Sequence, residues 1–202
     1  MKIKTKIPDF NLERHYELVK SNWIPLNEPR NVYSALALSF PLMIMNALIT
    51  LGLLNIFTPL PLMLSDINSG SISISIDLRH LIVLIILLLL HEALHLISIP
   101  GFWKSETTSF GITPVGGFIY SEESIPKWRH ICITLAPFLV ISVIIPMLLG
   151  FFNLFTPFFI VLILLNSMAS SVDILNLILV ATQVPKGSQI TSNGPKTYWK
   201  SI

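Results

Sequence analysis

Four long stretches of the chain consist almost entirely of apolar side chains. An α-helix rises about 1.5 Å per residue, so about 20 apolar residues cross the hydrocarbon core of a bilayer. The four stretches, at 32–57, 78–99, 131–149 and 157–181, are all close to this length. The pattern therefore predicts four transmembrane helices that together form one membrane domain.

Two shorter segments have different periods. In the segment 9–23, Leu12, Tyr16, Val19 and Trp23 recur at helical spacing between charged residues, which predicts an amphipathic helix along the inner membrane surface. The segment from Ser109 to Tyr120 alternates apolar with small residues and contains a Pro and a Gly-Gly pair, so it predicts two short extended segments. Such a hairpin would either offer a strand edge to an extended peptide or cover the mouth of the domain.

The composition changes the picture from a core-forming chain to a membrane protein. Only 12% of the 202 residues are charged and the mean hydropathy is +0.72, whereas soluble domains carry about 25% charged residues. The formal net charge of +2 comes without a basic tract, which argues against nucleic-acid binding. Cys132 is the only cysteine, which excludes an internal disulfide. We expect an all-α membrane protein with a short amphipathic N-terminal helix and a small cytosolic hairpin-like loop.

The positive charges predict the orientation, because Lys and Arg of short loops stay on the cytoplasmic side. Six basic residues precede the first span, three lie between the second and third, and three follow the fourth, whereas the other loops hold only Arg79. Both termini and the middle loop should therefore be cytosolic, in a multi-pass protein of a cell membrane, expected to be prokaryotic. We divide the chain into a juxtamembrane segment 1–31, a membrane domain 32–181 and a cytosolic tail 182–202. No apolar run behind the first basic residues indicates a signal peptide, so we expect the protein to begin at Met1.

The second predicted span ends in the motif His91-Glu92-Ala93-Leu94-His95. On a helix the two histidines lie one turn apart on one face and converge on one metal ion, while Glu92 projects beside them toward a metal-bound water. This is the arrangement of zinc hydrolases, and ionisable groups within a span are tolerated where they pair, bind metal or line a wet cavity. The alternative is a hydrogen-bonded polar cluster or a proton path without chemistry.

A catalytic zinc takes three protein ligands, so a third is needed. Asp173 is the only other acidic residue within a span, and it lies as far before the end of the fourth span as His91 lies before the end of the second. Both should sit about 12 Å below the inner boundary. The competing third ligands are His130 and the loop residues Glu106, Glu122 and Glu123.

Several further residues of the third and fourth spans are candidates for supporting roles. Asn166 and Asn176 share a helix face with Asp173 and would orient a ligand, bind a reacting carbonyl or bond between helices. Ser170 belongs to a small, polar stretch that permits close helix approach. Pro137 should kink the third span and either open a path for water or ease packing.

These residues together resemble a known family. The motif at 91–95, the glycine-containing loop, Leu135-Ala136-Pro137 and the segment around Asp173 are similar to the "putative zincin peptidase" family of small prokaryotic membrane proteins, which is distantly similar to the site-2 proteases. The resemblance covers about residues 78–181. It implies zinc ligation by His91, His95 and Asp173, with Glu92 as base, and cleavage of membrane-embedded or membrane-proximal peptides. Site-2 proteases carry an Asn-Pro-Asp-Gly type element, whereas here Val172 and Ile174 flank Asp173.

Two functions of different classes follow from these residues. The first is a zinc-dependent intramembrane peptidase whose partners are the bilayer and a membrane protein or peptide substrate. The second is a non-catalytic membrane protein, such as a transporter or an immunity-type factor, that binds metal or protons through the same cluster. The sequence does not specify the oligomeric state.

Overall fold

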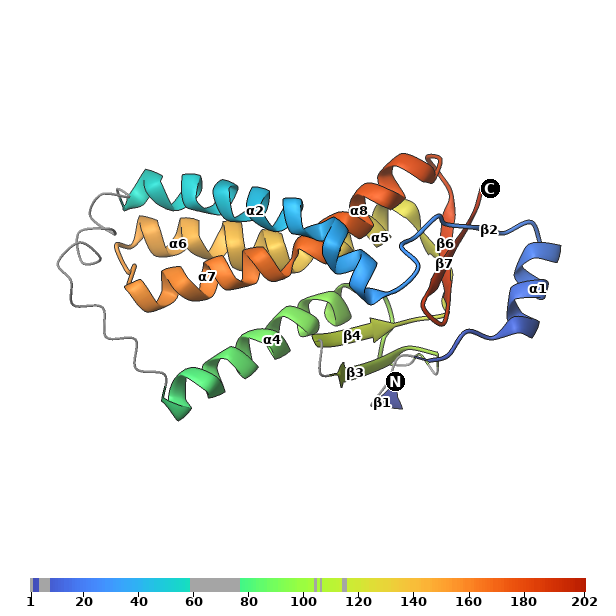
Figure 1. Ribbon diagram of the computed structural model, residues 1–202, viewed down its shortest axis with the longest axis horizontal. Helices are drawn as coiled ribbons and strands as arrows, with labels where there is room; N and C mark the ends of the chain where they lie inside the picture. The colour runs from blue at the N-terminus through green and yellow to red at the C-terminus, as the bar shows by residue number, and fades with distance from the viewer. Residues whose placement is uncertain (1, 4–7, 59–76, 104, 106, 114–115) are drawn as a thin grey trace.

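The structure is a computed structural model that describes residues 2–3, 8–58, 77–103, 105, 107–113 and 116–202 (Figure 1). Long helices occupy one end of the molecule, and two small sheets with both termini occupy the other. The fold is mostly helical, with four helices or helix pairs long and apolar enough to cross a membrane. This part of the predicted fold class is confirmed.

The four predicted spans each correspond to a helix or to two helices joined end to end. The first two are single helices, and each begins at a capping box, formed by Asn31 with Ser34 and by Asp77 with His80. The third is interrupted by a π-helical turn and the fourth by a break at Ser170. Their bounds are α2 Val32–Phe57; α4 Leu78–Ser98; α5 Lys127–Leu139, η1 Val140–Ile144 and α6 Ile145–Phe151; α7 Pro157–Ala169 and α8 Ser171–Gln183.

The small, polar stretch at the end of α7 brings helices close together. Ser167 is fully buried, its Oγ lies 2.7 Å from Thr50 Oγ1 of α2, and its carbonyl accepts a hydrogen bond from Asn46 Nδ2. Small side chains allow backbones to approach, and buried hydroxyl and amide groups then bond between the helices. Polar contacts between uncharged side chains thus join the first predicted span to the fourth.

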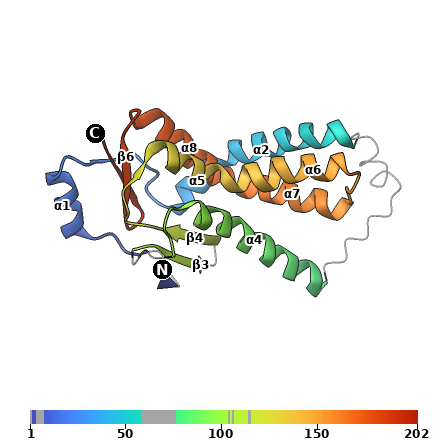
Figure 2. The same ribbon diagram turned by 180° about the vertical axis from the view of Figure 1, so that it is seen from behind.

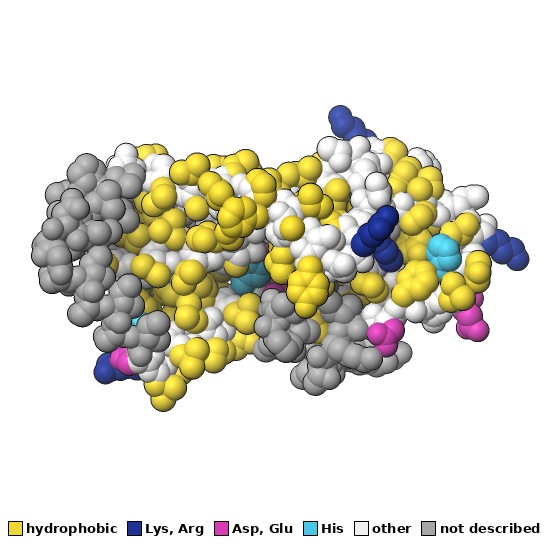
Figure 3. Space-filling view, in the orientation of Figure 1, with side chains coloured by type: hydrophobic (Ala, Val, Ile, Leu, Met, Phe, Trp, Pro, Cys, Tyr) yellow, Lys and Arg dark blue, Asp and Glu magenta, His cyan; other side chains and the backbone are white. Residues whose placement is uncertain are grey.

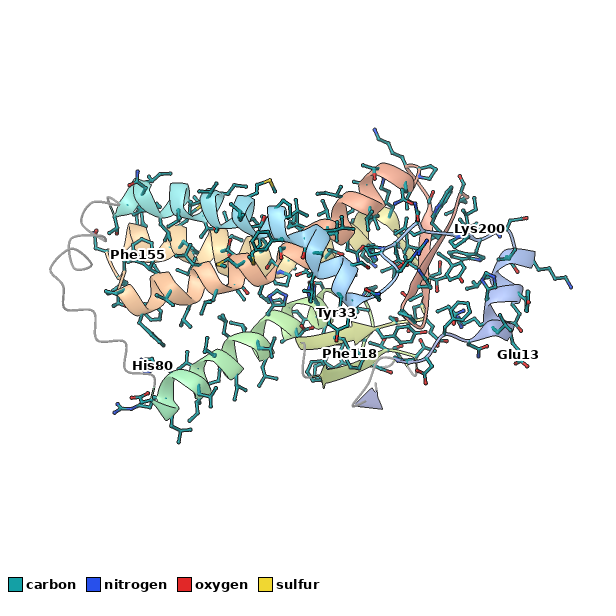
Figure 4. The ribbon with its side chains drawn as sticks, viewed as in Figure 1. Glu13, Tyr33, His80, Phe118, Phe155 and Lys200 are labelled. Atoms are coloured by element: carbon teal, nitrogen blue, oxygen red, sulfur yellow. The ribbon has the colours of Figure 1, made fainter. Side chains whose placement is uncertain are left out.

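The middle loop forms the predicted hairpin. Strands β3 (Ser109–Thr113) and β4 (Gly116–Tyr120) pair antiparallel with Ser109 opposite Tyr120, and β1 (Lys2–Ile3) adds a parallel strand to β3. The order is β1-β3-β4, which leaves β4 at one edge among the described residues. In Figure 4, Phe118 of β4 lies near the end of α4 opposite to the end that carries His80.

A second sheet was not predicted. Its strands are β2 (Ile24–Pro25), β7 (Lys196–Lys200), β6 (Gln189–Asn193) and β5 (Ile125–Pro126), in that order and all antiparallel. The segment interpreted as a tail therefore contains a hairpin whose turn includes Gly194. Gly194 has a φ of +56°, and a Cβ there would meet the backbone of Asp9 and Phe10 at under 3 Å, so only glycine fits.

The predicted amphipathic helix forms as α1 (Leu12–Lys20). It is held to the sheet end of the molecule by an Arg14–Glu122 ion pair of 2.7 Å and by a 2.8 Å bond between His15 Nδ1 and the Tyr198 hydroxyl. Figures 1 and 2 both show the sheets between α1 and the four apolar helices. The position of α1 along a membrane surface stays a prediction.

Candidate metal centre

Three potential metal ligands meet where α4 passes α8. His91 and His95 come from α4 and Asp173 comes from the first turn of α8, and one ligand atom from each lies within 4.8 Å of the others. The two carboxylate oxygens of Asp173 lie 3.2 Å from His91 Nε2 and 3.4 Å from His95 Nε2. A tetrahedral zinc ion with bonds of about 2.0–2.2 Å separates its donor atoms by about 3.3 Å, so these two nitrogen–oxygen distances have the size that such an ion requires.

A hydrogen bond to Nδ1, the ring nitrogen that does not face Asp173, fixes the orientation of His91. Its Nδ1 lies 2.9 Å from Asn166 Oδ1. The Asn166 amide is itself oriented by its Nδ2, which donates to the Pro137 carbonyl at 3.3 Å and to Ser142 Oγ at 2.9 Å. Asn166 Oδ1 is therefore the acceptor, His91 Nδ1 carries the hydrogen, and the lone pair of Nε2 is directed at the metal centre.

The orientation of His95 depends on a missing backbone hydrogen bond in α5. In an α-helix the carbonyl of Ile133 would accept the N–H of residue 137, but that residue is proline and has no N–H. The Ile133 carbonyl accepts His95 Nδ1 at 2.8 Å instead. His95 thus also carries its hydrogen on Nδ1 and presents the lone pair of Nε2, as metal ligation requires.

The π-helical turn completes the support of Asn166. Ser142 lies in that turn, is fully buried, accepts from Asn166 Nδ2 and donates from its Oγ to the Ile163 carbonyl at 3.3 Å. A π-turn shifts the register of a helix and re-aims its side chains. Ser142 therefore reaches the fourth span, and the third span fixes the ligands of the second through Asn166 and Ile133.

Glu92 is buried beside the three ligands. Only 7% of its surface is exposed, and its carboxylate makes no hydrogen bond to another described residue. It is close enough to His91, His95 and Asp173 to interact electrostatically with all three. A carboxylate without a fixed partner next to a metal centre is free to bind and release a proton.

The other predicted residues divide into those near the centre and those outside it. Ser170 Oγ donates to the Asn166 carbonyl at 3.0 Å, so this hydroxyl bonds to the backbone of α7. His130 is absent from the group of three ligands and lies against Asn176, yet His130 Nε2 and Asn176 Oδ1 are both buried without a hydrogen bond in the described part of the chain. The structure thus brings together His91, His95 and Asp173 but not the competing His130.

The loop carboxylates lie away from the centre where the structure describes them. Glu122 pairs with Arg14 and accepts from the Tyr120 hydroxyl at 2.9 Å, and Glu123 is absent from the ligand group. Glu106 falls outside the described residues.

Two supporting groups escaped sequence reasoning, the Ile133 carbonyl and Ser142. A signal for the first was available, because a proline within a helix always frees the carbonyl four residues before it, here Ile133. Ser142 gave no comparable signal, since its role depends on the π-helical register.

Comparison with known proteins gives one match. A model of the family described as "Putative zincin peptidase" matches residues 83–189, which is more than half of the chain and includes α8 and most of α4. Neither the curated proteins nor the solved structures contain a match, so the likeness to site-2 proteases stays a prediction.

Proposed function

The chain belongs to the "Putative zincin peptidase" family, and from this premise we propose that it is a zinc-dependent peptidase embedded in a membrane. The observation that carries the proposal is the convergence of His91 Nε2, His95 Nε2 and the Asp173 carboxylate. Two imidazoles and one carboxylate are the donor set of many catalytic zinc sites, which keep a fourth position for water. The two Nδ1 hydrogen bonds leave both Nε2 atoms free for the ion.

In this proposal each residue has a distinct part. His91, His95 and Asp173 hold the zinc ion, which when bound supplies the Lewis acidity that activates a water molecule and the peptide carbonyl. Glu92 takes a proton from the attacking water and passes it to the leaving nitrogen as the C–N bond breaks. Asn166 and the Ile133 carbonyl keep the two imidazoles in place throughout.

We also propose that the four apolar helices cross a membrane with the sheets on the cytosolic side. The two described termini and both sheets lie at one end (Figures 1 and 2). Most Lys and Arg side chains visible in Figure 3 lie at this end, as the retention of positive charge in the cytoplasm requires. The substrate is then a membrane-embedded or membrane-proximal segment. It must unwind at the metal centre, because a helix conceals its carbonyls in hydrogen bonds.

Zinc content and hydrolysis test the proposal together. We expect about one zinc per chain in detergent-purified protein, lost in His91→Ala and in Asp173→Ala and retained in Glu92→Gln. Hydrolysis of a fluorescence-quenched unfolded protein such as casein should fall by about a hundredfold or more in Glu92→Gln.

Two results would contradict the proposal. A wild type free of zinc after metal-replete expression would remove the cofactor. A Glu92→Gln variant with full hydrolytic activity would exclude the proposed base. Bound zinc without any hydrolysis would favour the non-catalytic metal-binding alternative.

A further inference from the structure

One face of α4 points at α7 along three helical turns. His80, Leu84, Leu87 and His91 are spaced by four, three and four residues, so they share one face of the helix. The two end members contact α7. The His80 ring lies 5.5 Å from the Phe158 ring, and His91 bonds to Asn166. The leucines between them must therefore also face α7.

Between these two contacts the facing side chains remain uncovered. Leu84 is 40% exposed and Leu87 is half-buried on α4, while Phe159 is 41% exposed and Leu162 is half-buried on α7. Ile82, on the opposite face of α4, is 47% exposed, hardly more than Leu84. All residues of α4 are described, and only His91 and Glu92 are buried. We call the space between Leu84, Leu87 and the facing residues of α7 the α4–α7 slot.

The slot leads to the metal centre. The eleven steps from His80 to His91 rise about 16 Å, so the slot is about three helical turns long. Figures 1 and 2 both show α4 diverging from α7 away from the sheets. Figure 3 shows a histidine and an acidic side chain at the bottom of a hollow in the hydrophobic face. The Asp173 side chain, at the inner end of the slot, keeps 22% of its surface exposed.

We propose that the α4–α7 slot binds one apolar helix of a membrane-protein substrate and directs that helix to the metal centre. This inference rests on the proposed function. The run from Leu81 to Leu90 contains only Leu, Ile and Val, so a backbone placed there finds no hydrogen-bond partner. An extended chain in the slot would leave its N–H and C=O groups unpaired, whereas a helix pairs them internally.

Continuity with the metal centre selects the substrate over a second copy of this chain. A helix in the slot ends beside Asp173 and Glu92, where its terminal residues can unwind against polar groups. Past that point, α4 packs against β4, so the chain has a route out of the apolar region. A second copy that occupied the slot would instead seal the centre from any substrate.

The test uses a photocrosslinking residue on each face of α4. Benzoylphenylalanine replaces Leu84 in one protein and the similarly exposed Ile82 in the other, both in a Glu92→Gln background that prevents cleavage. The probe is a single-span peptide of about 20 Leu and Ala residues with lysines at both ends, in phosphatidylcholine vesicles. We expect at least fivefold more peptide adduct from position 84 than from position 82.

Equal adduct from the two positions, or more from position 82, would overturn the slot. Adducts between two copies of the protein from position 84 would also overturn it, because they assign the slot to a dimer. A second measurement uses Leu84→Trp, which fills the slot, and Ile82→Trp as its control. The first should weaken peptide binding, measured by fluorescence anisotropy, at least fivefold and the second less than twofold.

Zinc analysis of the same samples separates this inference from the proposed function. Peptide adduct at position 84 in a protein without zinc would contradict the proposed peptidase function and support substrate binding in the slot. Stoichiometric zinc with equal adduct from both positions would contradict substrate binding in the slot and leave the proposed peptidase function intact.

Discussion

The second and fourth predicted spans both contribute side chains to the candidate metal centre, but they are packed very differently. In α4 only His91 and Glu92 are buried, and most of its leucines and isoleucines are exposed. In α7 and α8, apolar side chains such as Ile163 and Val180 are buried in cores shared with other elements. The difference teaches that α4 is packed mainly at the end that carries the histidines, where Leu96 lies against the core of Ile99, Phe102 and Ile133, and is left exposed along its outer length.

Hydrogen bonds from α7 and α5 add to the packing at this end of α4. Asn166 and the Ile133 carbonyl each hold one imidazole of α4, and both belong to helices with buried cores. A loosely packed helix can then move along its outer length while its ligand end stays fixed. The following predictions test this contrast between α4 and the better-packed helices, from the largest expected effect to the smallest.

Asn166→Ala should have the largest effect of the supporting residues. It removes the acceptor for His91 Nδ1 and leaves Ser142 Oγ and the Pro137 carbonyl without their donor. Loss of such an outer hydrogen bond weakens metal binding about 10- to 100-fold, measurable by competition with a chromogenic chelator. Ser167→Ala is the matched control, because Ser167 is equally buried but bonds to Thr50 and not to a ligand. Equal zinc affinities of the two variants would contradict the role of Asn166.

Pro137→Ala should have a smaller effect on the same measurement. The new N–H at residue 137 competes with His95 Nδ1 for the Ile133 carbonyl, so zinc affinity should fall by up to about tenfold. Pro146→Ala is the control, since Pro146 is also buried in the third span but lies nine residues further along. Unchanged affinity in Pro137→Ala would show that the freed carbonyl is not needed.

Alanine substitutions in α7 and in α4 should lower the free energy of unfolding by different amounts. Ile163 is 3% exposed, so Ile163→Ala leaves a cavity and should cost about 2 kcal/mol or more. Leu87 faces the slot and is half-buried, so Leu87→Ala should cost about 1 kcal/mol or less. Thermal unfolding in one detergent compares the two variants directly. A larger loss for Leu87→Ala would show that α4 is packed as firmly as α7.

The smallest effect concerns the sheet end, beside the end of α4. Burial raises the pKa of Tyr120 to about 12, and its hydroxyl donates to Glu122 and accepts from the Gly194 N–H. The folded state holds this proton more tightly than the unfolded state, whose pKa is about 10. The stabilisation is therefore complete below pH 10 and is lost as the pH rises toward 12.

Tyr120→Phe should reduce this alkaline loss and cost about 1 kcal/mol at pH 8. Unfolding measured from pH 8 to 12 checks both effects, with Tyr16→Phe as the control because Tyr16 is exposed. If Tyr120→Phe loses as much stability at alkaline pH as the wild type, another titrating group causes that loss.

The apolar runs were sufficient to predict the four long helices, because a run of about 20 apolar residues rarely forms anything other than a long apolar helix. Depth along the spans also predicted that Asp173 would lie level with His91, and the structure brings the two side chains together. Their part in metal ligation stays a prediction. Counting from the ends of the spans worked because straight helices convert residue number into depth.

The features that could not be predicted depend on contacts between distant segments. The π-turn at Val140–Ile144 and the break at Ser170 follow no residue preference strong enough to place them. The C-terminal hairpin had a local signal in the Asn193-Gly194 pair, but β2 and β5 are two-residue strands that exist only through pairing. The position of α1 likewise follows from His15 and Arg14 meeting partners far along the chain.

The second sheet has a consequence for how the protein is made. It joins β2, which precedes the first span, to β6 and β7, which follow the fourth. Tyr198 and Thr197 of β7 supply the partners of His15 and Glu28 from the N-terminal segment. During synthesis these N-terminal groups must wait until the four long apolar helices and the strands that follow them have been made. Closure of the sheet is therefore the final step of assembly, and a nascent chain that stops after the fourth span exposes unpaired strand edges that quality-control proteases can recognise.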